Sequence, residues 1–204
     1  MSKVVCDISV SADGFSAGHD QTEEHPFGEA DETTLHSWMF DTPEENRAEV
    51  AAITDAKAFI MGRNMFGPVR GAWSGDWQGW WGPEPPYHGP VFVLTHHERA
   101  PLVMDGGTSF HFVTEGIDAA LERAKAVPGD ANIAIAGGAS TVNQYLAAGL
   151  LDELRLHITP FTLGAGTRIF DGVPPLTLEQ ISSRAATRVT HVTYRIRDVG
   201  ATTP

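Results

Sequence analysis

The stretch NIAIAGGAST at residues 132–141 carries the strongest fold signal in the sequence. Its first five residues form an apolar run, which is typical of a strand buried on both faces of a parallel sheet. The glycine pair Gly137 and Gly138 follows at once, and Ser140 and Thr141 begin an expected helix. Such a turn presents free backbone N–H groups to an anion, which the helix dipole also favours. The segment therefore predicts either an anion site, such as one for a pyrophosphate, or an ordinary tight turn.

Gly62, Arg63 and Asn64 follow a second expected strand, the apolar run at residues 57–61. An arginine at the end of a strand can pair with a phosphate, and an asparagine there can cap a helix or donate to the same group. A solvent-facing arginine in a turn is the commoner situation, so this segment alone leaves both interpretations open.

Thr95 and His96 begin a third such segment, which continues to Arg99 beyond the strand expected over residues 91–95. Histidine and arginine here could hold the 2′-phosphate that distinguishes NADP from NAD. We expect no metal site at the adjacent histidines, because neighbours in a strand point apart and a metal needs three or four converging ligands. Open α/β sheets bind ligands at the carboxyl ends of their strands, so the three segments reinforce one another.

Strand-like and helix-like segments alternate along most of the chain, which predicts an α/β fold with a mostly parallel sheet. The last two expected strands, at about 176–184 and 188–197, have no helix between them and are expected to be antiparallel. Residues 31–53 are helical in composition, with a break before Pro43, which suits the first position of a helix. Residues 154–159 alternate apolar and polar side chains, which predicts a strand with one wetter face.

The chain resembles the dihydrofolate-reductase-like superfamily and, within it, the reductase domain of the bifunctional riboflavin-biosynthesis deaminase-reductase. The similarity spans about residues 3–197. The matching pieces are SVSADGF at 9–15, MGRN at 61–64, VLT at 93–95, Gly137-Gly138 with LAAGLLDEL at 146–154, and PFTLGAG at 160–166.

This resemblance implies a single domain, residues 1–204, with three αβα layers, a mostly parallel central sheet and an antiparallel C-terminal strand. It implies NADPH as cofactor, a small heterocyclic molecule as substrate, and a cis peptide bond between Gly137 and Gly138. The cofactor-binding residues that it implies are Gly62, Arg63, Asn64, Thr95, His96, Gly137, Gly138, Ala139, Ser140 and Thr141.

A reductase of this kind needs a proton donor, and a carboxylic acid in a partly buried pocket that raises its pKa is suited to that role. Asp13 is the first candidate, because it follows the first strand within the matching piece at 9–15. Asp31 and Glu32, at the start of the next expected helix, are the second candidates. The alternative roles are an ordinary Asp-Gly turn for Asp13 and a helix cap for Asp31.

Four tryptophans, Trp73, Trp77, Trp80 and Trp81, lie in a segment rich in glycine and proline at residues 67–90. An irregular segment of this length is usually functional or disordered. Its aromatic rings could anchor the loop, fill a dimer interface or cover a flat heterocycle. We favour anchoring.

Two other functions stay open. Ala136 stands where the riboflavin reductase domain often has Glu, and Ala12 replaces its Leu. These departures leave room for a protein that binds the nucleotide without efficient reduction. A flavin-dependent protein that uses the same cleft is the other alternative.

Acidic side chains outnumber basic ones, with 26 Asp and Glu against 14 Lys and Arg and a formal net charge of −12. A field of that sign repels nucleic acid and anionic lipid, so we expect neither as a partner. It also repels NADPH, which therefore needs a local positive site. No apolar run approaches the ~20 residues of a membrane span, and the single cysteine, Cys6, excludes an intramolecular disulfide. We expect a cytoplasmic protein, and the resemblance implies a homodimer.

Overall fold

The computed structural model describes residues 2–29, 32–67 and 70–197. Within them the strands are β1 (Val4–Ser11), β2 (Phe15–Ala17), β3 (Ala58–Gly62), β4 (Pro90–Leu94), β5 (Leu102–Val103), β6 (Ser109–Val113), β7 (Ile133–Gly137), β8 (Glu153–Thr159), β9 (Thr167–Arg168), β10 (Thr177–Ala186) and β11 (Val189–Arg197). The helices of the same residues are α1 (Glu32–Phe40), α2 (Arg47–Thr54), α3 (Arg63–Phe66), α4 (Ile117–Lys125) and α5 (Ala139–Ala147), with a 3-10 turn at Asp105–Gly107.

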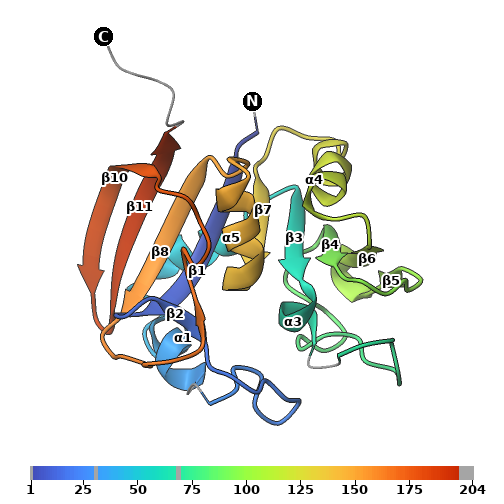
Figure 1. Ribbon diagram of the computed structural model, residues 1–204, viewed down its shortest axis with the longest axis horizontal. Helices are drawn as coiled ribbons and strands as arrows, with labels where there is room; N and C mark the ends of the chain where they lie inside the picture. Colours follow the sequence, from blue (N-terminus) through green and yellow to red (C-terminus); the bar gives the residue numbers. More distant parts are fainter. Residues whose placement is uncertain (1, 30–31, 68–69, 198–204) are drawn as a thin grey trace.

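The main sheet runs in the order β10-β11-β8-β1-β7-β3-β4-β6-β5 (Figure 1). The strands from β8 to β6 pair in parallel. The C-terminal hairpin β10–β11 adds to this sheet through β11, which pairs antiparallel with β8. At the opposite edge, β5 pairs antiparallel with β6. The predicted sheet, parallel in its centre with an antiparallel C-terminal end, is therefore confirmed.

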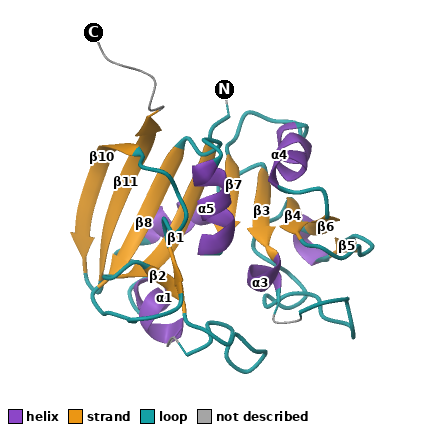
Figure 2. Cartoon of the chain, viewed as in Figure 1, coloured by secondary structure: helices purple, strands orange, loops and turns teal. Residues whose placement is uncertain are grey.

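Helices cover both faces of this sheet (Figure 2). Val4, Cys6 and Ile8 of β1 pack in one buried cluster with residues of α4 and α5. On the opposite face, Trp38 of α1 donates from Nε1 to Ser9 Oγ of β1 at 3.0 Å. The alternation of β1 side chains thus separates two layers of helix, and the expected αβα architecture is confirmed.

The Trp-rich segment lies over the same sheet face as α3. Trp73, Trp77 and Trp81 pack against a buried cluster that includes Phe66. Trp73 Nε1 donates to the backbone oxygen of His97 at 2.8 Å, and Trp77 Nε1 donates to that of Phe66 at 2.9 Å. The indoles supply both apolar contact and hydrogen bonds, which agrees with the anchoring role.

The prediction that Pro43 begins a helix is wrong. Pro43 lies in a turn, and α2 begins at Arg47. The fully buried Asn46 holds this turn, because its Nδ2 donates to the backbone oxygens of Trp38 at 3.0 Å and Thr42 at 2.9 Å. A side chain that bonds to the preceding backbone replaces helical hydrogen bonds there.

The prediction of a wetter face on β8 is also wrong. His157 and Thr159 are 2% and 0% exposed, because β8 lies between β1 and β11 and α1 covers it. The Trp38 and His157 rings are 4.5 Å apart. His157 Nδ1 lies 2.8 Å from His191 Nδ1, and His191 Nε2 lies 2.9 Å from Asn46 Oδ1. The polar face is thus a buried hydrogen-bond network.

We expect Asn46→Ala to lower the free energy of unfolding by roughly 2–4 kcal/mol, since it leaves several buried polar groups without partners. Asn46 donates to two backbone oxygens and accepts from His191 Nε2 and Arg184 Nη2. Urea unfolding measures the change. The matched control is Asn64→Ala at an exposed position, and equal losses for the two variants would contradict the assignment.

The second prediction concerns pH. Burial, followed by the nearby His157, lowers the pKa of His191 from 6.5 to about 4. Between these values the unfolded chain binds this proton more readily than the folded chain. The stabilising contribution is therefore present above pH 6.5 and is lost as the pH falls toward 4, by at most about 3 kcal/mol.

Unfolding curves measured across this range should show a flatter pH dependence for His191→Gln than for the natural chain. His25→Gln, at an exposed position, should keep the natural slope. An unchanged slope in His191→Gln would show that other groups control the acid response.

Candidate functional site

The three strand ends that carry the predicted site lie side by side. β7, β3 and β4 are parallel neighbours, so their carboxyl ends meet at one edge of the sheet. Met61 of β3 pairs with Gly137 of β7, and Gly62 pairs with Leu94 of β4, directly before Thr95. Figure 1 shows the arrowhead of β3 leading into α3 at this edge. The structure therefore brings the three polar segments together.

Close backbone packing joins the first two segments. A Cβ atom at position 62 would overlap the hydroxyl of Thr141, so any larger residue would force the Thr141 side chain at the first turn of α5 to move. Gly137 has φ +124°, a conformation that glycine adopts readily, and its peptide bond to Gly138 is cis as expected. α5 begins at Ala139, with Gly138 as its N-cap. The first N–H groups of this helix lack intrahelical partners and can serve an anion.

Arg63 connects the second segment to the third. Its Nη1 donates to Thr95 Oγ1 at 3.2 Å, and its guanidinium carbon lies 3.5 Å from the centre of the Trp73 ring. Its Nε and Nη2 are buried without a hydrogen-bond partner. Burial lowers the pKa of Arg63, and the charges of Arg70 and Arg99 lower it further. Arg63 is therefore a cation whose N–H groups are only partly satisfied.

Arg99 lies on the same indole and completes a pair of arginines. Its guanidinium carbon is 4.8 Å from the Trp73 ring, and its Nη2 donates to the backbone oxygen of Trp77 at 2.6 Å. Its Nη1 is buried without a partner. Burial also lowers the pKa of Arg99, against the opposite effect of Asp76. Two neighbouring guanidinium groups with unused donors favour an anion.

Arg99 was a candidate phosphate ligand within the third segment, but nothing in the sequence indicated that it shares the Trp73 ring with Arg63. Arg99 is the fifth residue of the segment that begins at Thr95, and Trp73 lies in an irregular loop. Their contact depends on the path of residues 70–89, which no local pattern encodes.

The remaining predicted residues differ in how accessible they are. Asn64, His96 and Ser140 have exposed side chains at the strand ends. Ala139 and Thr141 are 1% and 5% exposed, so Ala139 can reach a ligand only through its backbone. The binding roles of these residues stay predictions.

Asp13 does not have the raised pKa expected of a proton donor. A hydrogen bond from Ser11 Oγ at 2.6 Å, followed by one from Leu163 N at 3.0 Å, lowers the pKa of Asp13 to about 2. Gly164 N also donates to this carboxylate, at 2.8 Å. The side chain is held ionised and ties the β1 turn to the loop after β8, which is the turn role considered from the sequence. Asp31 lies outside the described residues.

Among residues 2–29, 32–67 and 70–197, no helix is long and apolar enough to cross a membrane. In that part of the chain there is also no group of three or more side chains placed to hold a metal ion.

Solved structures share this fold. The first is a protein assigned to riboflavin biosynthesis from Shewanella sp. PV-4, with a TM-score of 0.62, 22% identity, and coverage of 96% of this chain and 99% of that chain. Dihydrofolate reductase from Enterococcus faecalis, complexed with NADP(H) and RAB-propyl, has a TM-score of 0.59, 14% identity, and coverage of 96% and 97%. RibD from Acinetobacter baumannii has a TM-score of 0.61 and 14% identity, with coverage of 97% of this chain and 59% of that chain.

No curated protein matches the sequence. The profile of the RibD C-terminal domain matches residues 2–192, which is nearly the whole of the described chain. This match, together with the shared fold, shows that the chain belongs to the RibD C-terminal domain family.

Proposed function

We propose that the chain is an NADPH-dependent oxidoreductase that reduces a small heterocyclic substrate. The observation that carries this proposal is the group of unsatisfied guanidinium N–H atoms on Arg63 and Arg99 at the carboxyl ends of parallel strands. Membership of the RibD C-terminal domain family supports it. The substrate class we propose resembles 5-amino-6-(5-phosphoribosylamino)uracil or dihydrofolate. The expected homodimer and cytoplasmic location stay predictions.

The residues at this edge fit the phosphates of a dinucleotide. Buried donors without acceptors are costly unless a ligand supplies the acceptor, and a phosphate supplies several. Arg63 and Arg99 would hold one phosphate, with His96 and Asn64 exposed nearby. The first turn of α5 would hold the pyrophosphate, which the glycine pair allows to approach closely.

NADPH would supply the hydride, and the chain would position it and deliver a proton. Asp13 is ionised and already accepts three hydrogen bonds, so it is poorly suited to deliver that proton. We propose Asp31 as the donor instead, with its neighbour Glu32 as the other candidate, acting directly or through a water molecule.

We expect Arg63→Ala to weaken NADPH binding by about 1–3 kcal/mol, the scale of a hydrogen bond to a charged group. NADPH fluorescence titration measures the change. Arg47→Ala, on the exposed start of α2, is the matched control and should bind like the natural chain. An Arg63→Ala variant with unchanged affinity would remove Arg63 from the site.

A second candidate function is nucleotide binding without efficient reduction, which the ionised state of Asp13 favours. Loss of NADPH absorbance with a panel of pterins, flavin precursors and quinones separates the two candidates. We expect turnover with at least one heterocycle. NADPH binding without turnover on the whole panel would support the second candidate. A purified protein that retains a flavin would instead support a flavin-dependent function.

A further inference from the structure

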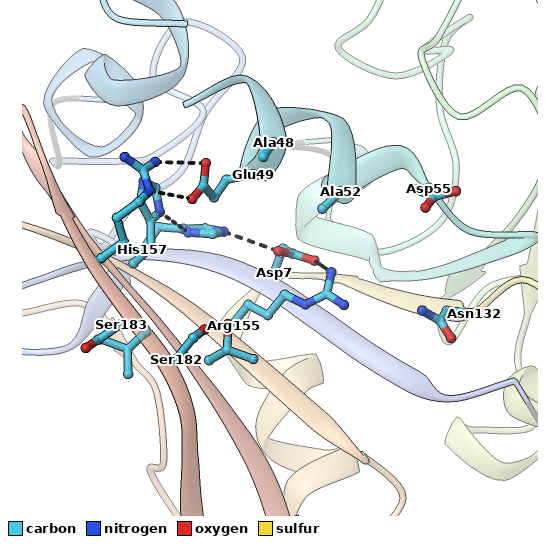
Figure 3. A pocket seen from close by; sticks show the side chains of 14 residues that line it. Asp7, Ala48, Glu49, Ala52, Asp55, Asn132, Arg155, His157, Ser182 and Ser183 are labelled. Atoms are coloured by element: carbon cyan, nitrogen blue, oxygen red, sulfur yellow. Dashed lines mark hydrogen bonds and ion pairs between the residues drawn. The ribbon is translucent and has the colours of Figure 1, made fainter. Parts of the chain in front are cut away.

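A cavity of about 430 Å³ lies on the sheet face that α1 and α2 cover. It is bounded by α2 on one side and by β1, β8 and the β10–β11 hairpin on the other (Figure 3). Asp55 and Asn132, which also line it, precede β3 and β7. The cavity therefore reaches the amino ends of these strands, whereas the proposed nucleotide site lies at their carboxyl ends. Its volume is within the range of small-molecule sites.

The two arginines of this cavity have already used most of their hydrogen-bonding groups. Arg155 donates from Nη1 to Asp7 Oδ2 at 3.2 Å and from Nε to Glu153 Oε1 at 2.9 Å. Arg184 donates from Nε to Glu49 Oε1 at 2.9 Å and from Nη2 to Asn46 Oδ1 at 2.9 Å. These cations are neutralised by the protein itself, which disfavours an anionic ligand.

The hydrogen-bond network fixes the protons on the two histidines. Asn46 donates through Nδ2 to backbone oxygens, so its Oδ1 must accept from His191 Nε2. A neutral His191 then has no proton on Nδ1, and this atom accepts from Nδ1 of His157. The low pKa of His191 agrees with its neutral form.

This assignment leaves two acceptors facing each other. With its proton on Nδ1, a neutral His157 presents a lone pair at Nε2, which lies 3.3 Å from Asp7 Oδ1. Both atoms are buried and lack a hydrogen-bond partner. The side chains of His157 and Asp7 are 3% and 6% exposed, and both line the cavity. Two adjacent acceptors of this kind need either an added proton or a donor group from a ligand.

We propose that this cavity binds a small organic cation rich in N–H donors, such as an alkylammonium or alkylguanidinium compound, against the wall that Asp7 and His157 form. Three carboxylates line the cavity, from Asp7, Glu49 and Asp55, against the two guanidinium groups. Because both guanidinium groups are paired with carboxylates, the polar atoms that still lack partners are hydrogen-bond acceptors. Asp55 adds a carboxylate at the far end of the cavity. A linear cation with donors at both ends matches this arrangement.

The test uses agmatine and putrescine as probes, with sodium acetate as the anionic comparison, in isothermal titration of the full chain. We expect saturable binding of at least one cation, no binding of acetate, and a rise in melting temperature with cation concentration. Asp7→Asn should raise the dissociation constant about tenfold or more, as the loss of a charged hydrogen bond implies. Asp76→Asn, on the remote Trp-rich loop, should leave it unchanged.

A second variant keeps the test decisive if Asp7→Asn does not fold. Ala52 of α2 lines the cavity, whereas Ala51 of the same helix is exposed and does not. Ala52→Leu should fill the space and abolish binding, and Ala51→Leu should bind like the natural chain. Absence of saturable cation binding, binding of acetate instead, or equal binding by both leucine variants would overturn the proposal. Absence of binding would indicate that a proton on His157, and not a ligand, lies between His157 Nε2 and Asp7 Oδ1.

Discussion

The contact between Gly62 and Thr141 determines how close α5 comes to the end of β3. A side chain at position 62 would meet the Thr141 hydroxyl, so the first turn of the helix lies directly over the end of this strand. The pairing of Met61 with Gly137 brings the backbone of β7 to the same place. Arg63 is the next residue after Gly62, so the same packing positions it. The positive end of α5 and the Arg63 guanidinium are therefore held at one edge by the same backbone constraint.

The carboxyl edge of the sheet and the α2 cavity differ in which buried hydrogen-bonding atoms lack partners: donors at the first and acceptors at the second. At the carboxyl edge, Arg63 and Arg99 have buried N–H groups without acceptors, and both guanidinium groups lie against the Trp73 ring. On the α2 face, by contrast, each guanidinium meets a carboxylate, and the unused atoms are acceptors on Asp7 and His157. Each unsatisfied buried group costs about 1–3 kcal/mol. The fold thus has one region that a bound anion would stabilise and another that a bound cation or proton would stabilise.

Much of the framework could be predicted because its signals are local. The apolar run at 132–136 and the glycine pair after it are adjacent in the sequence, and they correctly gave a buried strand that leads into α5. The wetter face expected on β8 failed for the opposite reason. Alternation shows which side chains share a face, but only tertiary packing decides whether that face meets water, and here Trp38 covers His157. The raised pKa expected for Asp13 was wrong for a similar reason, since the donors that lower this pKa include Leu163 and Gly164, far along the chain.

The charge of the chain shows why an anion site here must be built from local groups. With a net charge of −12, the whole-molecule field opposes an approaching dinucleotide. Short-range donors can still prevail, because hydrogen bonds from buried guanidinium groups act at low dielectric, whereas distant surface charges are screened within about 10 Å at moderate salt. The same field assists a cation that approaches the α2 cavity. Added salt should therefore change the two affinities in opposite directions. It weakens the repulsion of an anion at the carboxyl edge, and it weakens the attraction of a cation to the α2 cavity.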